Sequence, residues 1–379
     1  MKFNIIIIFV IFLSDSLLGQ TKQLIQSPLQ NYNLILIGEP HYIIEKDKIE
    51  LTIINDIINK TDKNIVLFLE YPLSMNYFID KLFTDNDTIS LKTYLLNRQN
   101  KIVDKLSVKN ELLYKKIINI YQLNKHSNHI IIKCIDYELK LRPLIYTILT
   151  ILNKYNITSD EILKQKNILN ELLNKSKHTI KDYEYFRNEF KSHFCNNLYL
   201  YNSIITNKDE LWYISKMLKN AIALKIYSEE RELMLYNNII ANYNDSSYHV
   251  AIMGSAHVNK YYKNDIAILG NRLSVGYLLN NSYKSPFRGK VYSIYIFVKN
   301  IKTINSVFSY ENKFYFIIDK NKINYLSSLM EKNITYIVPT RKKFKYVYKA
   351  YNLLILIENG TSNLYDNQFE LQNNNIESN

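Results

Sequence analysis

Short apolar runs of strand-type residues alternate with long stretches of helical periodicity, and this alternation limits the possible folds more than any other feature. The four clearest runs are LILIG (34–38), NIVLFLE (64–70), HIIIKCIDYE (129–138) and YHVAIMG (248–254). Apolar residues recur at helical spacing at 45–59, at about 74–124 and at 139–242. Apolar strands separated by helices are typical of a parallel sheet covered on both faces. The pattern predicts a three-layer α/β/α fold with a largely parallel central sheet.

The domain organisation follows from where this alternation begins and ends. Further strand-like runs lie at 291–298, 313–319, 334–339 and 350–357. Because no linker or repeat interrupts the series, we expect one α/β domain over residues 28–362. The helical stretch at about 140–242 predicts an insertion that caps the strand ends. Residues 363–379 are rich in Asn and Gln, which is typical of a disordered polar tail.

The N-terminus has the features of a secretory signal. Lys2 precedes the apolar run IIIIFVIFL at 5–13, which is too short to span a bilayer, and Gly19-Gln20 is a suitable cleavage point. We expect residues 1–19 to be removed and the mature chain to be exported, as a periplasmic or secreted protein with no integral membrane span. The alternative is that the apolar run is a buried N-terminal strand.

The sequence contains two cysteines, Cys134 and Cys195, whose state depends on whether the chain is exported. Export permits a disulfide between them. However, Cys134 lies inside the strand-like run IIIKCID, so a buried free thiol is the alternative.

The net charge of +13 does not point to a nucleic-acid partner. The lysines are spread along the predicted helices among acidic residues, and the one tight basic cluster is Arg341-Lys342-Lys343. A protein that binds nucleic acid usually carries a basic stripe or a recognisable module. We therefore expect a solvated lysine-rich surface and a small-molecule or peptide substrate.

Polar residues follow the ends of all four clear strands. They are Gly38-Glu39-Pro40-His41, Glu70, Asp136 with Glu138, and Gly254-Ser255-Ala256-His257. Ligands of open parallel sheets bind beyond the carboxyl ends of the strands, so these groups are expected to converge on one edge. Singly, Glu70 and Asp136 are explained equally well as helix caps, and a lone histidine such as His257 is more often structural than catalytic. Their repetition favours a functional site, because converging acids and histidines repel or desolvate one another unless the site uses them.

Arg231 lies on an apolar helix face in the segment SEERELMLYNNII (228–240). It shares that face with Met234, Leu235 and Asn238. A guanidinium on an apolar stripe points inward and needs an anionic partner. The alternative is an exposed arginine paired with a nearby acid such as Glu230.

Taken in order, these motifs resemble a known superfamily. GE-x-H follows the first strand, an acid ends the second, Asn238 stands seven residues past Arg231, and a later strand ends in G-x-A-H-V. This order is similar to that of the erythromycin esterase-like, ChaN-like and Tiki/TraB-like proteins, and the late AYNLLILIENGTS resembles the closing strand of the esterase-like members. The resemblance covers about residues 30–362 and implies a three-layer α/β fold with the site at the strand ends. The Glu-x-His spacing is one residue shorter than the GE-x-T-H of esterase-like members. It is closer to that of the haem-binding ChaN-like and the peptidase-like Tiki branches.

The chemistry of the motif residues favours a hydrolase that uses activated water. His41, oriented by Glu39 or Glu70, is a suitable general base at neutral pH for attack on an ester, lactone or amide carbonyl. Arg231 or His257 is then placed to stabilise the oxyanion. The G-x-S-x-G pattern of a serine nucleophile is absent from the sequence.

Two alternatives stay open. His41, His257 and Glu70 form a possible ligand set for a divalent metal, as in a Tiki-like metal-dependent peptidase. The resemblance also allows a ChaN-like protein that binds haem, although the 33 tyrosines single out no axial ligand.

Overall fold

The computed structural model describes residues 31–40, 43–99, 105–127, 129–138, 140–220, 229–261, 273–302, 307–309, 334–339 and 347–361. Several sequence-based predictions fall elsewhere in the chain. The predicted signal at 1–19, His41, the strand-like run at 313–319 and the polar tail at 363–379 all lie outside the described residues.

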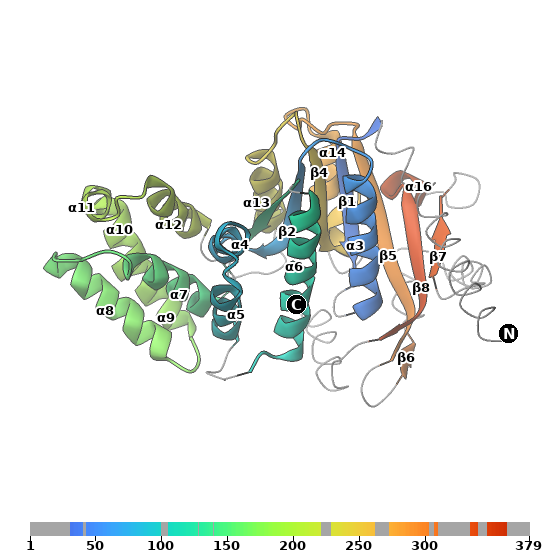
Figure 1. Cartoon of the computed structure of the whole chain (residues 1–379). Helices are drawn as coiled ribbons and strands as arrows, with labels where there is room; N and C mark the ends of the chain where they lie inside the picture. Colours follow the sequence, from blue (N-terminus) through green and yellow to red (C-terminus); the bar gives the residue numbers. More distant parts are fainter. Residues whose placement is uncertain are drawn as a thin grey trace. The chain divides into compact units, whose positions relative to one another are not determined.

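The described strands belong to one eight-stranded sheet (Figure 1). They are β1 (Leu34–Glu39), β2 (Ile65–Pro72), β3 (Ile130–Asp136), β4 (Tyr248–Gly254), β5 (Val291–Lys302), β6 (Val307–Ser309), β7 (Ile334–Ile337) and β8 (Leu353–Thr361). Their order is β3-β2-β4-β1-β5-β8-β7, with β6 paired to β5. The first six in that order run parallel, whereas β7 and β6 pair antiparallel with β8 and β5. The predicted α/β fold with a largely parallel sheet is confirmed.

The described helices lie mostly in the segments predicted from helical periodicity, but two of them, at 275–281 and 347–350, were not predicted. They are α3 (Ile44–Ile58), α4 (Ser74–Asp85), α5 (Thr88–Asn97), α6 (Val108–Ser127), α7 (Leu141–Leu152), α8 (Asp160–Asn174), α9 (Ile180–Tyr185), α10 (Ser192–Asn196), α11 (Leu198–Ile204), α12 (Lys208–Asn220), α13 (Glu229–Ile240), α14 (Val275–Asn281) and α16 (Val347–Ala350). A π-helical turn, η1 (Phe186–Lys191), joins α9 to α10, and a 3-10 helix, η2 (Ser255–Val258), follows β4. Within the part of the chain that the structure describes, no helix is both long enough and apolar enough to span a bilayer.

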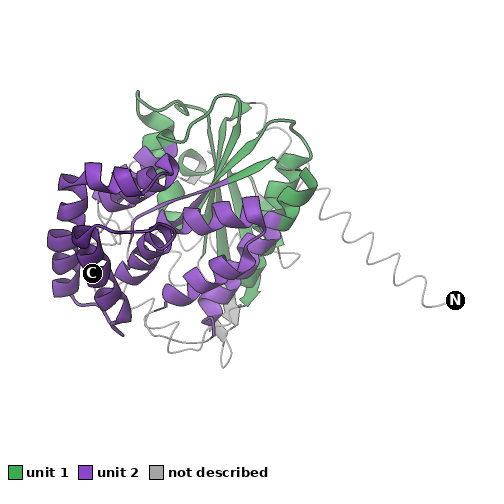
Figure 2. Cartoon of the chain, turned by 60° about the vertical axis from the view of Figure 1, so that its left-hand side comes forward, with its two compact units in different colours: residues 1–67, 122–131, 240–379 green, residues 68–121, 132–239 purple. Residues whose placement is uncertain are grey.

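The chain divides into two compact units (Figure 2). The first unit comprises residues 1–67, 122–131 and 240–379, and the second comprises 68–121 and 132–239. The first unit contains β1, β4, β5 and β8, and it also contains the first residues of β2 and β3, which continue into the second unit. The expectation of one domain over 28–362, with an insertion at about 140–242, stays a prediction.

In the first unit, β1 is the innermost strand, and its sequence explains why. Leu34, Leu36 and Ile37 are fully buried, and Ile35 is nearly so. Strand β1 pairs in parallel with β4 on one side and β5 on the other, so both of its faces must be covered. The crossover from β1 through α3 to β2 runs towards the β3 edge of the sheet. The crossover from β4 through α14 to β5 runs towards the β7 edge. Since such crossovers are right-handed, we infer that α3 and α14 cover opposite faces.

In the second unit, an asparagine side chain completes the hydrogen bonding of the edge strand β3. The amide of Asn76, on α4, donates to the Cys134 carbonyl at 3.0 Å and accepts from the Cys134 N–H at 2.6 Å. It thus makes the pair of bonds that a neighbouring strand would make. Because Cys134 is buried, its backbone groups need partners inside the protein. Both cysteines are free, which confirms the buried free thiol at Cys134 and excludes the disulfide.

The start of β8 differs from the sequence-based prediction. The run at 350–357 predicts a strand, but α16 ends at Ala350 and β8 begins at Leu353. Asn352 lies between them, and its side-chain oxygen accepts from the Ser293 N–H at 2.9 Å. A side chain therefore makes this bond, and the regular pairing starts one residue later, at Ile294 and Leu353. The prediction was wrong at 350–352 because apolar composition does not reveal that a side chain takes the place of the backbone in this hydrogen bond.

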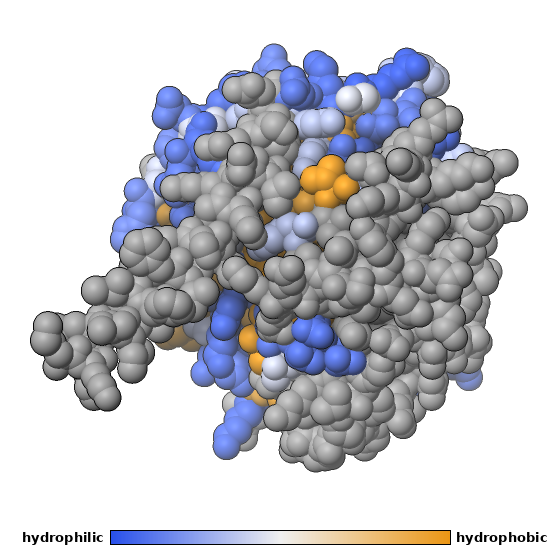
Figure 3. All heavy atoms as spheres, turned by 90° about the vertical axis from the view of Figure 1, so that its right-hand side faces the viewer, coloured by the Kyte–Doolittle hydropathy of each residue, from blue (hydrophilic) through white to orange (hydrophobic). Residues whose placement is uncertain are grey.

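The face on which β7 lies is mostly hydrophilic where the structure describes it (Figure 3). Apolar residues among the described ones form only small patches there. Small exposed apolar patches of this kind are normal on protein surfaces.

Candidate functional site

Two of the predicted motifs follow neighbouring strands in the first unit. β1 and β4 pair in parallel, and Glu39, the last residue of β1, lies opposite Gly254, the last residue of β4. The carboxyl ends of these two strands therefore lie side by side, as the sequence predicts. Glu39 is buried, and so is His257, which lies in η2 directly after β4.

The backbone between these motifs is packed closely, which explains Gly38. An added Cβ at Gly38 would meet Val258 Cγ2 at 2.4 Å and Ser255 Cα at 3.1 Å. The 3-10 helix η2 therefore lies against β1 at a distance that only glycine permits. The Ser255 hydroxyl fixes the same approach, because it donates to the Glu39 carbonyl at 3.0 Å. Gly38 thus contributes to the position of His257.

We expect Gly38→Ala to destabilise the protein by about 1–3 kcal/mol, because η2 must move away from β1 to make room for the methyl group. Urea unfolding measures this cost. Gly38→Ala combined with Val258→Ala should cost less than the sum of the two single changes, since the second removes the nearest obstructing atom. Strict additivity of the two costs would contradict the close-packing explanation.

A lysine that sequence reasoning missed neutralises part of the charge at the end of β1. The Lys46 ammonium, on the first turn of α3, lies 2.6 Å from Glu39 Oε2, 2.9 Å from Asp47 Oδ1 and 3.7 Å from Glu50 Oε1. Lys46 and Glu50 are buried as well as Glu39. The available signal was the position of Lys46 at a helix N-terminus, where the helix dipole disfavours a cation unless acids surround it.

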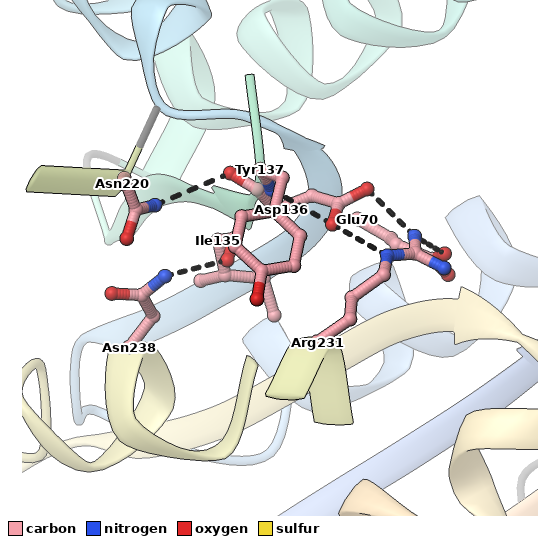
Figure 4. A network of polar contacts seen from close by, with 7 residues as sticks. All are labelled: Glu70, Ile135, Asp136, Tyr137, Asn220, Arg231 and Asn238. Carbon is pink, nitrogen blue, oxygen red and sulfur yellow. Dashed lines mark hydrogen bonds and ion pairs between the residues drawn. The ribbon is translucent and has the colours of Figure 1, made fainter. Parts of the chain in front are cut away.

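In the second unit, Arg231 joins two of the predicted acids (Figure 4). Its Nε donates to Asp136 Oδ1 at 2.9 Å, and its Nη2 donates to Asp136 Oδ2 at 2.7 Å and to Glu70 Oε1 at 2.6 Å. Burial by itself would lower the pKa of the Arg231 guanidinium, but the charges of Glu70 and Asp136 more than offset this and raise it. The prediction that Arg231 points inward to an anionic partner is confirmed, and the alternative of an exposed pair with Glu230 is wrong.

Two asparagines hold the end of β3 next to this ion-pair cluster (Figure 4). Asn238 follows Arg231 by seven residues on α13 and donates to the Ile135 carbonyl at 2.8 Å. Asn220, at the end of α12, donates to the Asp136 carbonyl at 3.5 Å. The spacing of Arg231 and Asn238 therefore has a structural meaning, because one helix face binds both the side chain and the backbone at the end of β3.

Glu138 has a different role from the other strand-end acids. It is fully buried and accepts from the Ser74 N–H at 2.6 Å and from the Ser74 hydroxyl at 2.8 Å. Ser74 opens α4, whose N-cap residue Leu73 makes no side-chain capping bond. A carboxylate from a distant segment therefore caps this helix, as the unpaired N–H groups and the helix dipole favour. The sequence suggested such a cap for Glu70 and Asp136, but the structure places it at Glu138.

The Glu138 cap predicts a specific pH dependence of stability. Burial raises the pKa of the Glu138 carboxyl from 4.5 to about 7. Between pH 4.5 and about pH 7, Glu138 keeps a proton in the folded protein that it has released in the unfolded chain. Its carboxyl group therefore makes stability fall as pH rises towards 7. We expect Glu138→Gln to gain stability relative to the wild type between about pH 5 and about pH 8. Urea unfolding of both proteins across this range measures the difference. Parallel pH curves would contradict the prediction.

The predicted site residues fall into two groups. Glu39 and His257 belong to the first unit, and Glu70 and Arg231 belong to the second. His41 lies outside the described residues. The convergence of all five residues on one site therefore stays a prediction, as does the metal ligand set of His41, His257 and Glu70.

Comparison with known proteins supports the fold. No protein-family model matches the chain, and no curated protein matches it. The chain is similar to the solved structure of a histidine-to-asparagine variant of erythromycin esterase EreC in its open conformation, with a TM-score of 0.57, 11% identity, and coverage of 90% of this chain and 93% of that chain.

Two further solved structures have the same architecture. A Bacillus cereus protein matches with a TM-score of 0.56 and 14% identity over 89% of this chain and 91% of its own. A succinoglycan biosynthesis protein matches with a TM-score of 0.56 and 10% identity over 91% of each chain. The chain thus has the α/β fold of erythromycin esterase, and the resemblance drawn from the motifs is confirmed at the level of the fold.

Proposed function

We propose that this protein is an exported hydrolase that cleaves an ester, lactone or amide bond with water activated by His41. The observation that supports the proposal is the parallel pairing of β1 with β4, in which Glu39 at the end of β1 lies opposite Gly254 at the end of β4. An acid and histidines at adjacent strand ends suit general base catalysis near neutral pH. The likeness in fold to an erythromycin esterase supports the same choice.

In this proposal the residues of the first unit carry the proton transfer. His41 takes the proton from water, and Glu39, two residues before it, orients the imidazole. His257 donates to the oxyanion of the tetrahedral intermediate. The proton then passes from His41 to the leaving group, so that an acid and an alcohol or amine are released.

Arg231 is better suited to positioning than to binding the oxyanion. Its guanidinium already donates to Glu70 and Asp136, so the three side chains together carry one net negative charge. An oxyanion beside that charge would be repelled. We therefore assign to Arg231 and Glu70 the role of fixing one another and the end of β3, and we give the oxyanion to His257.

The proposal includes export, for which the N-terminal sequence is the support. Residues 1–19 are proposed to be removed, which leaves the mature chain in a periplasm or outside the cell with a small-molecule or peptide substrate. N-terminal sequencing of the exported protein should find Gln20 or a close neighbour. An intact Met1 would contradict this part of the proposal.

The function is tested with the mature protein and a panel of probes. p-Nitrophenyl esters, small lactones, erythromycin and chromogenic amides are incubated with the protein, with and without a metal chelator. Hydrolysis of at least one probe that survives the chelator supports the proposal. Metal content and an absorption spectrum with added haem are measured on the same sample. A stoichiometric metal required for turnover would favour the peptidase alternative. A strong haem band without turnover would favour the haem-binding alternative.

A further inference from the structure

The acids around Lys46 form an arrangement that resembles a cation site. One oxygen from each of Glu39, Asp47 and Glu50 lies within 4.8 Å of the others. Hard divalent cations prefer carboxylate oxygens grouped in this way. The three acids carry three negative charges, and Glu39 and Glu50 are buried, so the group requires a compensating cation.

Lys46 supplies one positive charge from within the chain. Its ammonium contacts all three carboxylates, at 2.6, 2.9 and 3.7 Å. The lysine is buried, although it lies on the first turn of α3, where the helix dipole disfavours a positive charge. The acids, and not the helix, therefore stabilise the positive charge of Lys46 at this position.

We propose that Lys46 is a built-in cation of this cluster, which lies where a divalent metal would otherwise bind and holds the Glu39 carboxylate at the end of β1. Lys46 is thus a positioning residue for the Glu39 carboxylate. The inference concerns the three acids only, so its test does not depend on the proposed hydrolase activity.

The test replaces Lys46 by Met, which keeps most of the length of the side chain and removes its charge. Binding of Mn²⁺ to the purified mature protein is counted from the loss of the electron paramagnetic resonance signal of free Mn²⁺. We expect Lys46→Met to bind Mn²⁺ at least about tenfold more tightly than the wild type, with saturation near one ion per chain. Adding Glu50→Gln should abolish this binding, because it removes one of the three charges.

Two further variants act as controls. Lys48→Met removes a charge of the same sign from an exposed position on α3 and should bind Mn²⁺ no better than the wild type. Lys46→Arg keeps the charge and should likewise gain no Mn²⁺ binding. The proposal would be overturned if the wild type bound Mn²⁺ tightly and Glu50→Gln removed that binding. It would also be overturned if Lys46→Met and Lys48→Met gained Mn²⁺ binding equally. A folded Lys46→Met that binds no Mn²⁺ would overturn it too.

If Lys46→Met by itself does not fold, the stability of a double variant provides a second test. The double variant Lys46→Met with Glu50→Gln carries one buried negative charge fewer, so it should be more stable than Lys46→Met. This gain is expected only if the lysine acts through its charge. If the double variant is as unstable as Lys46→Met, the lysine acts through the packing of its carbon chain and the proposal is wrong.

Discussion

Replacing His41 by asparagine should lower the rate of hydrolysis by about a hundredfold or more and change the free energy of unfolding by less than about 1 kcal/mol. Asparagine keeps the approximate size and some hydrogen bonding of the side chain but has no group that titrates near neutral pH. His41 follows the end of β1 and the stiff Pro40, so it is expected to contribute little to packing. The rate on the best probe and urea unfolding of the same sample measure both effects.

The control for this change is His126→Asn, which removes an exposed histidine from α6 and should leave the rate unchanged. Three results are informative. A stable His41→Asn variant with a hundredfold lower rate supports the role of the base. A variant that unfolds shows that His41 is structural. A stable and fully active variant shows that the base is elsewhere, and His257 becomes the candidate.

Replacing Arg231 by methionine should destabilise the second unit by about 3–5 kcal/mol, because it leaves the carboxylates of the buried Asp136 and the half-buried Glu70 without their cation. Glu70 lies two residues before the end of β2, and Asp136 is the last residue of β3, so their repulsion acts on both strands. Urea unfolding gives the cost. Arg187→Met, on the exposed side of η1, is the matched control and should change stability by less than about 0.5 kcal/mol.

A triple variant separates charge from packing at Arg231. Glu70→Gln and Asp136→Asn remove both negative charges, so together with Arg231→Met they should recover part of the lost stability. If the triple variant is less stable than Arg231→Met, the guanidinium acts mainly as a hydrogen-bond donor to these residues. Charge compensation would then be the wrong explanation for the buried arginine.

Much of the fold was predictable from the sequence because its strands are apolar on both faces. The runs ending at Gly38 and Gly254 read as buried strands, and they pair as expected. The inward direction of Arg231 was also predictable, since it depends only on helical periodicity. These features are local, and local patterns report on burial and secondary structure.

The contacts that complete the site were not predictable in the same way. Arg231 binds acids that lie 161 and 95 residues away in sequence, so the sequence supplied the candidates but not their pairing. Glu138 caps α4 through Ser74, which lies 64 residues away. Lys46 lies seven residues from Glu39, yet a strand end and a helix start separate them. Such contacts depend on the tertiary arrangement, which periodicity does not encode.

The most direct test of the proposed mechanism is the pH dependence of kcat/KM on one ester probe, measured for the wild type and for His41→Asn. If an imidazole is the base, kcat/KM of the wild type should rise with pH through one ionisation near neutrality and then level off. His41→Asn should lose this ionisation together with most of the rate. A profile with the same ionisation and the same magnitude in both proteins would contradict the assignment of His41 as the base.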